Sequence, residues 1–266
     1  MATAIWVLND QLHQAQAALA SHGPGEARVV VVEAEAVLRQ RPHLQKQILF
    51  WSAQRHFAAE LRQAGWQVDQ LEAASHSEAL IPWLKQHGIS RLLVMAPPDR
   101  PIRQAIDRLA QHSDWPCELE WIDNNQFLWT AEEFSRWAGS KKQLRMEFFY
   151  REGRKRFNVL MDGDQPQGGQ WNFDQDNRKP PPKGLEGPAP LWFEPDAITT
   201  AVIAKLKALA ERYELPGESE AFGWGVTQHQ AQQVLEHFIA TRLAGFGPYQ
   251  DAMVSGQPTL WHSLIS

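Results

Sequence analysis

Cysteine is almost absent from this chain: Cys117 is the only one in 266 residues. One thiol excludes an internal disulfide framework and a cysteine-ligated metal cluster, and it fits a reducing cytosol. The ten histidines are not spaced like metal ligands, since no H-E-x-x-H or similar pattern occurs. No metal site is therefore predicted within the chain.

Long apolar runs are missing as well. No stretch approaches the ~18 apolar residues that a membrane-spanning helix needs. Residues 1–6 lack the basic segment followed by an apolar run that marks a signal peptide. We therefore expect a cytoplasmic protein that does not enter a membrane.

The net charge is small, at −5, so the chain is not basic throughout. A nucleic-acid-binding surface would have to be a local patch. Phosphate-binding glycine motifs are missing too: no G-x-G-x-x-G follows the first predicted strand, and G-x-x-x-x-G-K-S/T does not occur. Their absence argues against a dinucleotide site or a P-loop.

The first half of the chain alternates β-branched runs with helical patterns. The candidate strands are residues 5–8, 29–33, 67–71, 91–96 and 118–122. Two runs, Val29–Val32 and Leu92–Met95, are apolar at every position, as strands covered on both faces require. Helices are expected between them, at about 43–64, 77–87 and 101–111. This series predicts an α/β fold with a doubly wound, parallel, five-stranded sheet.

The second half changes character. Thr130 and Glu133 form a capping-box pattern for a short helix that ends near Trp137. Further helices are expected at about 141–159, 197–213 and 227–245, the last with Thr227 as its N-cap. We accordingly divide the chain into three parts: an α/β domain over 1–130, a basic segment and interdomain loop over 131–195, and the first helices of a helical domain over 196–266.

Polar residues follow several predicted strands. Asp10 and Gln11 follow the first, and Glu33 and Glu35 lie at the end of the second. In an open parallel sheet, ligands bind beyond the carboxyl ends of the strands. These side chains would suit a heterocycle with several N–H and hydroxyl groups, and would suit a phosphate poorly. The alternative is that they are ordinary helix caps and turn residues.

A basic, aromatic-rich segment spans residues 141–156. It holds seven lysines and arginines against two glutamates, a net charge of +5. Basic groups neutralise phosphates, and the interleaved aromatic rings can stack on bases. The candidate contacts with nucleic acid or with another domain are Lys142, Arg151, Arg154, Lys155 and Arg156. The alternative is a solvated helix face.

The segment 168–179 mixes aromatic and polar side chains in a glycine-rich loop. Trp171 can stack while Asn172 and Arg178 hydrogen-bond, which suits a ligand or a seam between domains. We add these three residues to the candidate contacts with nucleic acid or with another domain. A packed connection without a ligand is the alternative, because long loops are either functional or merely connecting.

Several segments together resemble one family. They are Asp10–Leu12, Ser52–Leu61, Met146–Arg151, Leu160–Gly163, Gly168–Asp174, Gly245–Gly247, Gln250–Met253 and His262–Ser266. Over nearly its whole length, the chain resembles the N-terminal half of an iron–sulfur bacterial cryptochrome/photolyase, also called photolyase-related protein or prokaryotic (6-4) photolyase.

The resemblance implies that residues 1–130 are an antenna domain that binds a 6,7-dimethyl-8-ribityllumazine-type chromophore. A helical C-terminal domain would carry FAD and a [4Fe-4S] cluster. Energy from the antenna would pass to reduced FAD, which would donate an electron to a (6-4) photoproduct flipped out of damaged DNA. Because the chain ends at Ser266, where the helical domain is just beginning, FAD and the cluster would belong to the missing C-terminal part.

The resemblance also assigns residues. It places chromophore contacts at Asp10, Gln11, Glu33 and Glu35, with Val32 and Val37 lining the pocket. Val32 and Val37 stand where some members place a cysteine and a glutamate, and Asn9 stands where many have glycine. These differences remove polar contacts near the lumazine.

Two functions fit the sequence. The chain is the antenna portion of a flavoprotein whose full-length relative repairs (6-4) photoproducts with light, or it is a non-enzymatic light-sensing or chromophore- and partner-binding module. No catalytic residue is assigned in either case. Alone, the chain is expected to be inactive as a photolyase, because it lacks the FAD and iron–sulfur region.

Overall fold

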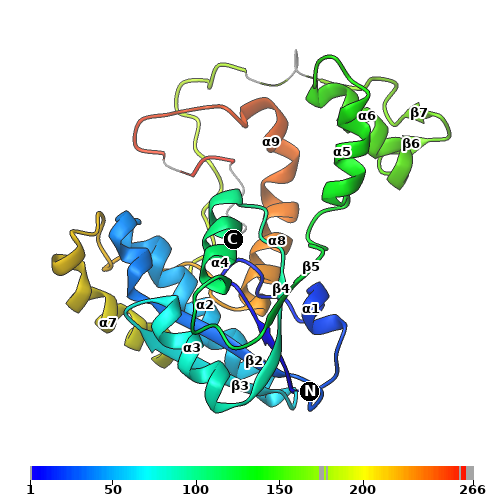
Figure 1. Ribbon diagram of the computed structural model, residues 1–266. Coiled ribbons are helices and arrows are strands. Elements are labelled where there is room, and N and C mark those ends of the chain that lie inside the picture. The colour runs from blue at the N-terminus through cyan, green and yellow to red at the C-terminus, as the bar shows by residue number, and fades with distance from the viewer. Residues whose placement is uncertain (1, 174–176, 178, 258, 262–266) are drawn as a thin grey trace. The chain divides into compact units, whose positions relative to one another are not determined.

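The computed structural model describes residues 2–173, 177, 179–257 and 259–261. It divides into two compact units (Figure 1). The first combines the residues up to 130 with residues 192–232, and the second combines residues 131–191 with 233–265. Among the described residues, none of the helices has both the length and the apolar character that crossing a bilayer requires.

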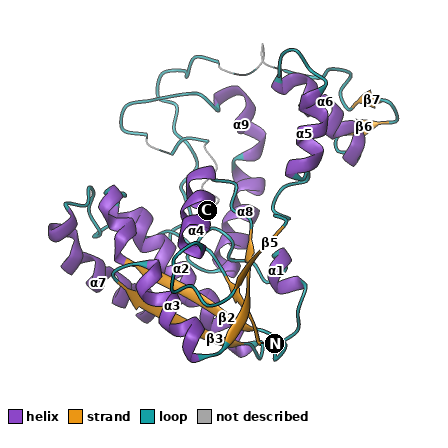
Figure 2. Ribbon diagram, viewed as in Figure 1, coloured by secondary structure: helices purple, strands orange, loops and turns teal. Residues whose placement is uncertain are grey.

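A parallel sheet lies at the centre of the first unit (Figure 2). Its strands are β1 (Ala2–Trp6), β2 (Arg28–Ala34), β3 (Gln67–Ala73), β4 (Ile89–Met95) and β5 (Glu118–Ile122). They are ordered β3-β2-β1-β4-β5, and every neighbouring pair is parallel. In the central register, Ile5 pairs with Val29 on one side and Leu93 on the other. The predicted α/β fold is confirmed.

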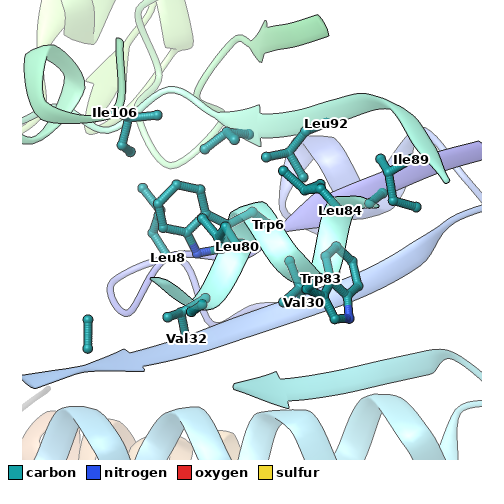
Figure 3. Packing of buried hydrophobic residues seen from close by; sticks show 14 residues of the cluster. Trp6, Leu8, Val30, Val32, Leu80, Trp83, Leu84, Ile89, Leu92 and Ile106 are labelled. Atoms are coloured by element: carbon teal, nitrogen blue, oxygen red, sulfur yellow. The ribbon is translucent and has the colours of Figure 1, made fainter. Parts of the chain in front are cut away.

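Helices cover both faces of this sheet. They are α1 (Ala17–Ala20), α2 (Leu44–Gln63), α3 (His76–Gln86) and α4 (Arg100–Ala110), while the 3-10 helix η1 (Glu35–Gln40) follows β2. Alternate residues of β2 enter opposite cores: Val30 and Val32 pack with α3, whereas Val29 and Val31 pack with α2. Figure 3 shows the first of these cores. All four valines are at most 2% exposed, as the uninterrupted apolar run predicts.

A third core joins α7 (Ala197–Tyr213) to α2 within the first unit. Val202 and Leu206 of α7 pack with Ile48 and Trp51 of α2, in a cluster whose described members include no strand residue. The Asp196 side chain caps α7 by accepting a hydrogen bond from the Thr199 N–H at 2.9 Å. Residues far apart in the chain thus form one hydrophobic layer.

The second unit is mainly helical. It contains α5 (Ala131–Gly139), α6 (Met146–Phe157), a short hairpin of β6 (Met161–Asp162) and β7 (Gln165–Pro166), most of α8 (Gln228–Thr241), and α9 (Leu243–Tyr249). Aromatic side chains hold α5 to α6, with the rings of Trp137 and Phe149 4.9 Å apart.

Several local expectations differ from the structure. The first strand, expected over 5–8, begins at Ala2 and ends at Trp6. The helix predicted over 141–159 begins only at Met146, and it ends where Asn158 takes the left-handed conformation, with φ of 51°. The helix predicted over 227–245 is divided into α8 and α9 after Thr241, whose hydroxyl donates to the His237 carbonyl. The β6–β7 hairpin was not predicted. Its strands are only two residues long, too short to show an alternating pattern.

Candidate functional site

A cavity of about 420 Å³ lies at the carboxyl end of the sheet in the first unit. Its walls come from the loops after β1 and β5, from α2, and from the segment that leads into α8. The polar lining includes Asn9, Asp10, His13, Glu60, Gln126, Thr227 and Gln228. The apolar lining includes Leu49, Phe50, Ala53, Phe57 and Val226. Such a cavity can hold a flat ring against aromatic side chains while polar groups bind its edges.

Hydrogen bonds fix the loops that form the polar rim. The amide of Gln126 donates to the Asp10 carbonyl at 2.7 Å, which joins the loop after β5 to the loop after β1. Asn9 accepts from the Gln54 amide at 2.7 Å, which ties the same loop to α2. The bond from Gln126 uses only the backbone carbonyl of Asp10, so the exposed Asp10 carboxylate remains available at the cavity.

Gln11 is fully buried beside this loop. Its amide nitrogen donates to the Met95 carbonyl at 2.8 Å and so fastens the end of β4. The amide oxygen has no hydrogen-bond partner among the described residues. Gln11 therefore supports the rim of the cavity from behind without lining it.

The Glu33 carboxylate lies at the end of β2 and is fully buried. It accepts from Arg55 of α2 at 2.6 and 2.8 Å and from Lys205 of α7 at 2.8 Å. The same two cations contact Glu72 of β3, at 2.9 and 2.7 Å. We call Glu33, Arg55, Glu72 and Lys205 the ion-pair cluster. Both oxygens of Glu33 already have cationic partners within the protein.

Protonation in the ion-pair cluster follows these contacts. Burial favours a raised pKa for Glu72, but the hydrogen bond from Lys205 and the charges of Lys205 and Arg55 outweigh it, so the pKa of Glu72 is lowered. The hydrogen bond to Glu33 raises the pKa of Arg55 despite partial burial. The ion-pair contacts thus favour the charged forms of Glu72 and Arg55.

Glu35 and the two valines also lie outside the cavity. Glu35 accepts from the Tyr213 hydroxyl of α7 at 2.8 Å. Val32 is 2% exposed in the core that faces α3 (Figure 3), and Val37 packs against the third core. Of the residues predicted to contact a chromophore, all of which the structure describes, Asp10 alone lines the cavity.

Sequence reasoning missed most of the cavity lining. Phe50, Ala53 and Phe57 follow the helical repeat of α2 and share one face, but this pattern is equally typical of core packing. Gln126 comes shortly after the fifth predicted strand, among polar residues, so its position at the carboxyl edge of the sheet could have been predicted. The segment 225–231 reaches the cavity only through tertiary packing.

In the second unit, the predicted basic residues gather around one tryptophan. The cationic groups of Arg151, Arg154 and Lys155 lie 5.4, 5.3 and 5.5 Å from the centroid of the Trp171 ring. Each distance is within the range of a cation–π interaction. The loop and α6, predicted separately as contact surfaces, therefore form one cluster, which we call the Trp171 cluster.

These basic side chains have different surroundings. Arg154 is only 7% exposed and donates to the carbonyls of Val159 and Leu160 beyond the helix end. Arg151 pairs with Glu147, and Arg156 pairs with Glu133. The exposed residues are Lys142, Lys155, Arg156 and Asn172, and Arg178 lies outside the described residues. The segment is thus partly a set of structural contacts and partly an exposed basic surface.

Comparison with known proteins identifies the family. Residues 5–224 match the family described as "Deoxyribodipyrimidine photo-lyase-related protein". The chain belongs to this family. The resemblance found in the sequence is confirmed, and the matched region of this photolyase-related protein includes β2 to β5, the end of β1, the ion-pair cluster and the Trp171 cluster.

Two relatives extend the comparison. A (6-4) photolyase of Agrobacterium fabrum is 36% identical over 273 residues, an alignment that covers the whole photolyase-related chain and 53% of the relative. An uncharacterized protein of Acanthamoeba polyphaga mimivirus is 27% identical over 151 residues, which is 54% of this chain and 76% of the viral protein. The chain therefore spans about half the length of the photolyase that it matches.

Proposed function

We propose that this chain is the antenna portion of a flavoprotein that repairs (6-4) photoproducts in DNA with light. The observation that carries the proposal is the cavity at the carboxyl end of the sheet. Its aromatic and polar lining has the chemistry that a heterocyclic chromophore needs, and it lies in a chain of the photolyase-related family. The 36% identity to a (6-4) photolyase supports the choice of lesion.

The proposed chromophore is a 6,7-dimethyl-8-ribityllumazine-type molecule. Its ring would pack against Phe50 and Phe57, and its hydroxyl groups would donate to the Asp10 carboxylate. Gln11, Val32, Glu33, Glu35 and Val37 would act indirectly, by fixing the strand ends and helices around the cavity. Bound there, the molecule would supply light absorption, while the protein holds it and limits its contact with water.

FAD and the [4Fe-4S] cluster are proposed to belong to the remainder of a full-length protein. The residues of this chain do not fit a cluster, because Cys117 is the only cysteine. Burial raises the pKa of the Cys117 thiol to about 11, so it lacks the thiolate that metal ligation requires. Within the described part of the chain, no group of metal-ligating side chains is assembled.

Damaged DNA is the proposed partner of the full-length protein. Exposed Lys142 and Lys155 can neutralise phosphates directly. Arg151, Arg154 and Arg156 would hold Trp171 and the end of α6 in place, since each is already engaged within the second unit. Exposed Asn172 is proposed to belong to the same contact surface, and Arg178, outside the described residues, is proposed as a contact from the sequence alone.

The chromophore proposal is tested by filling the cavity. Ala53→Trp places a bulky ring at the cavity wall, and we expect it to abolish the visible absorption and fluorescence changes seen when lumazine is added to the purified chain. Ala201→Trp makes the same change at an exposed position of α7, and this variant should bind lumazine as the original chain does. An original chain that is colourless and fails to take up added lumazine would refute the antenna role.

A further inference from the structure

The cavity in the first unit is lined by two acidic residues and, among the described residues, by no lysine or arginine. Asp10 and Glu60 both line it, and none of its lining residues, all of which are described, is a lysine or an arginine. His13 also lines it, and the His13 Nδ1 accepts the Ala15 N–H at 3.0 Å, so this ring nitrogen is engaged within the loop. Lys46 contacts the Phe50 ring from 5.5 Å but is not part of the lining.

Glu60 holds a distinctive position on α2. It is half-buried, and it lines both the 420 Å³ cavity and an adjoining hollow of about 380 Å³, which also contains Gln228 and His229. Unlike Glu33 and Glu72, neither Glu60 nor Asp10 forms an ion pair with another described residue. Two carboxylates therefore face this space with their charges uncompensated.

One feature of the fold opposes this negative charge. Helix α8 begins at Gln228, on the cavity wall, after the Thr227 hydroxyl has accepted the Gln230 N–H at 3.1 Å. A helix N-terminus is equivalent to roughly half a positive charge. Two full carboxylate charges outweigh this partial charge, so the groups on the cavity wall carry a net negative charge.

We propose that Glu60 is a specificity-determining residue of this cavity. Together with Asp10, it selects an uncharged planar heterocycle that carries hydroxyl groups, and it excludes the phosphorylated form of the same molecule. Hydroxyl groups donate to carboxylates, whereas a phosphate monoester brings about −1.5 to −2 charge and needs donors that these residues do not provide. The inference deepens the proposed chromophore role and rests on it.

The expected size of the effect follows from Coulomb repulsion. At a separation of about 8 Å in a water-like medium, two carboxylates weaken binding of a phosphate by about tenfold at low ionic strength. Glu60 should account for about half of the repulsion, hence roughly a threefold factor. The preference for the uncharged molecule over its phosphorylated form should diminish as added salt screens the charges.

Riboflavin and its 5′-phosphate, FMN, provide the test, because they differ only in the phosphate. Quenching of flavin fluorescence by the purified chain measures both affinities. We expect riboflavin to bind about tenfold more tightly than FMN, and Glu60→Gln to narrow this ratio roughly threefold with little change for riboflavin. Glu211→Gln, at an exposed position of α7, changes the net charge equally and should leave the ratio unchanged.

The outcomes separate the two proposals. Equal affinities for riboflavin and FMN in the original chain would overturn the charge selection while leaving the chromophore role intact. An unchanged ratio in a folded Glu60→Gln variant would overturn the assignment to Glu60. If that variant does not fold, the salt dependence of the ratio in the original chain decides, and a ratio insensitive to salt overturns the inference. Failure of riboflavin, FMN and lumazine alike to bind would overturn both proposals.

Discussion

Replacing Arg55 by glutamine would remove the guanidinium that donates two hydrogen bonds to the Glu33 carboxylate, at 2.6 and 2.8 Å. That carboxylate is 0% exposed, so water cannot replace the lost donors. Removing one partner of a buried ion pair costs about 3–5 kcal/mol. Because Lys205 still contacts Glu33 at 2.8 Å, we expect the lower end, about 3 kcal/mol.

The assay is urea unfolding of the purified chain, followed by far-ultraviolet circular dichroism. The free energy of unfolding is extrapolated to water for each variant. Arg136→Gln is the matched control, because it breaks a helical ion pair with Glu132 whose side chains are 71% and 82% exposed. Such a pair contributes at most about 0.5 kcal/mol. Adding Glu33→Gln to Arg55→Gln should restore part of the loss, since the double variant leaves no buried carboxylate at this position.

One result would refute this reasoning. If Arg55→Gln lowers the free energy of unfolding no more than Arg136→Gln does, the ion-pair cluster is not holding Glu33 in a dry environment. The sheet and α7 would then owe their association to the apolar contacts of the third core alone.

Three further predictions concern other described side chains. The pKa of Glu72 is lower in the folded protein than its unfolded value near 4.5, so the ionised carboxylate stabilises the fold above that pH. This stabilisation is lost as the pH falls through the folded pKa. The free energy of unfolding, measured against pH, should therefore decline less on acidification in Glu72→Gln than in the original chain. Because burial raises the pKa of Cys117 to about 11, its thiol should react with a disulfide reagent at pH 8 about a hundredfold more slowly than an unperturbed thiol, and urea should abolish the difference. Lys155→Glu should weaken DNA binding by the full-length protein and reduce the dependence of its DNA affinity on salt concentration. Lys207→Glu on α7 is the control and should change neither quantity. Equal effects of the two substitutions would contradict the assignment of the Trp171 cluster to DNA.

Much of the first unit could be predicted because its elements are set by neighbours in sequence. The strand predicted at 118–122 and the helix predicted at 197–213 have the bounds that the structure shows. Apolar periodicity and capping side chains act within a few residues, so they are visible without tertiary information. The division between α8 and α9 was not visible, because Thr241 is as compatible with a continuous helix as with a break.

The candidate site was less accessible to prediction. Asp10 was expected at the carboxyl end of the sheet, and it lines the cavity there because strand ends of a parallel sheet share one edge. Glu33 was expected beside it on the same argument. Its partner Lys205 lies 172 residues away in sequence, and no local pattern announces that contact.

The sequence by itself determined the family, the parallel α/β sheet and the presence of a basic aromatic segment. These properties depend on residue type and short-range spacing. The tertiary structure decided which carboxylates are neutralised and which are left facing a cavity, because charge compensation depends on distances between residues remote in the chain. Glu33 and Glu60 are the same residue type, yet Glu33 lies between two cations, whereas Glu60 lines the cavity together with Asp10.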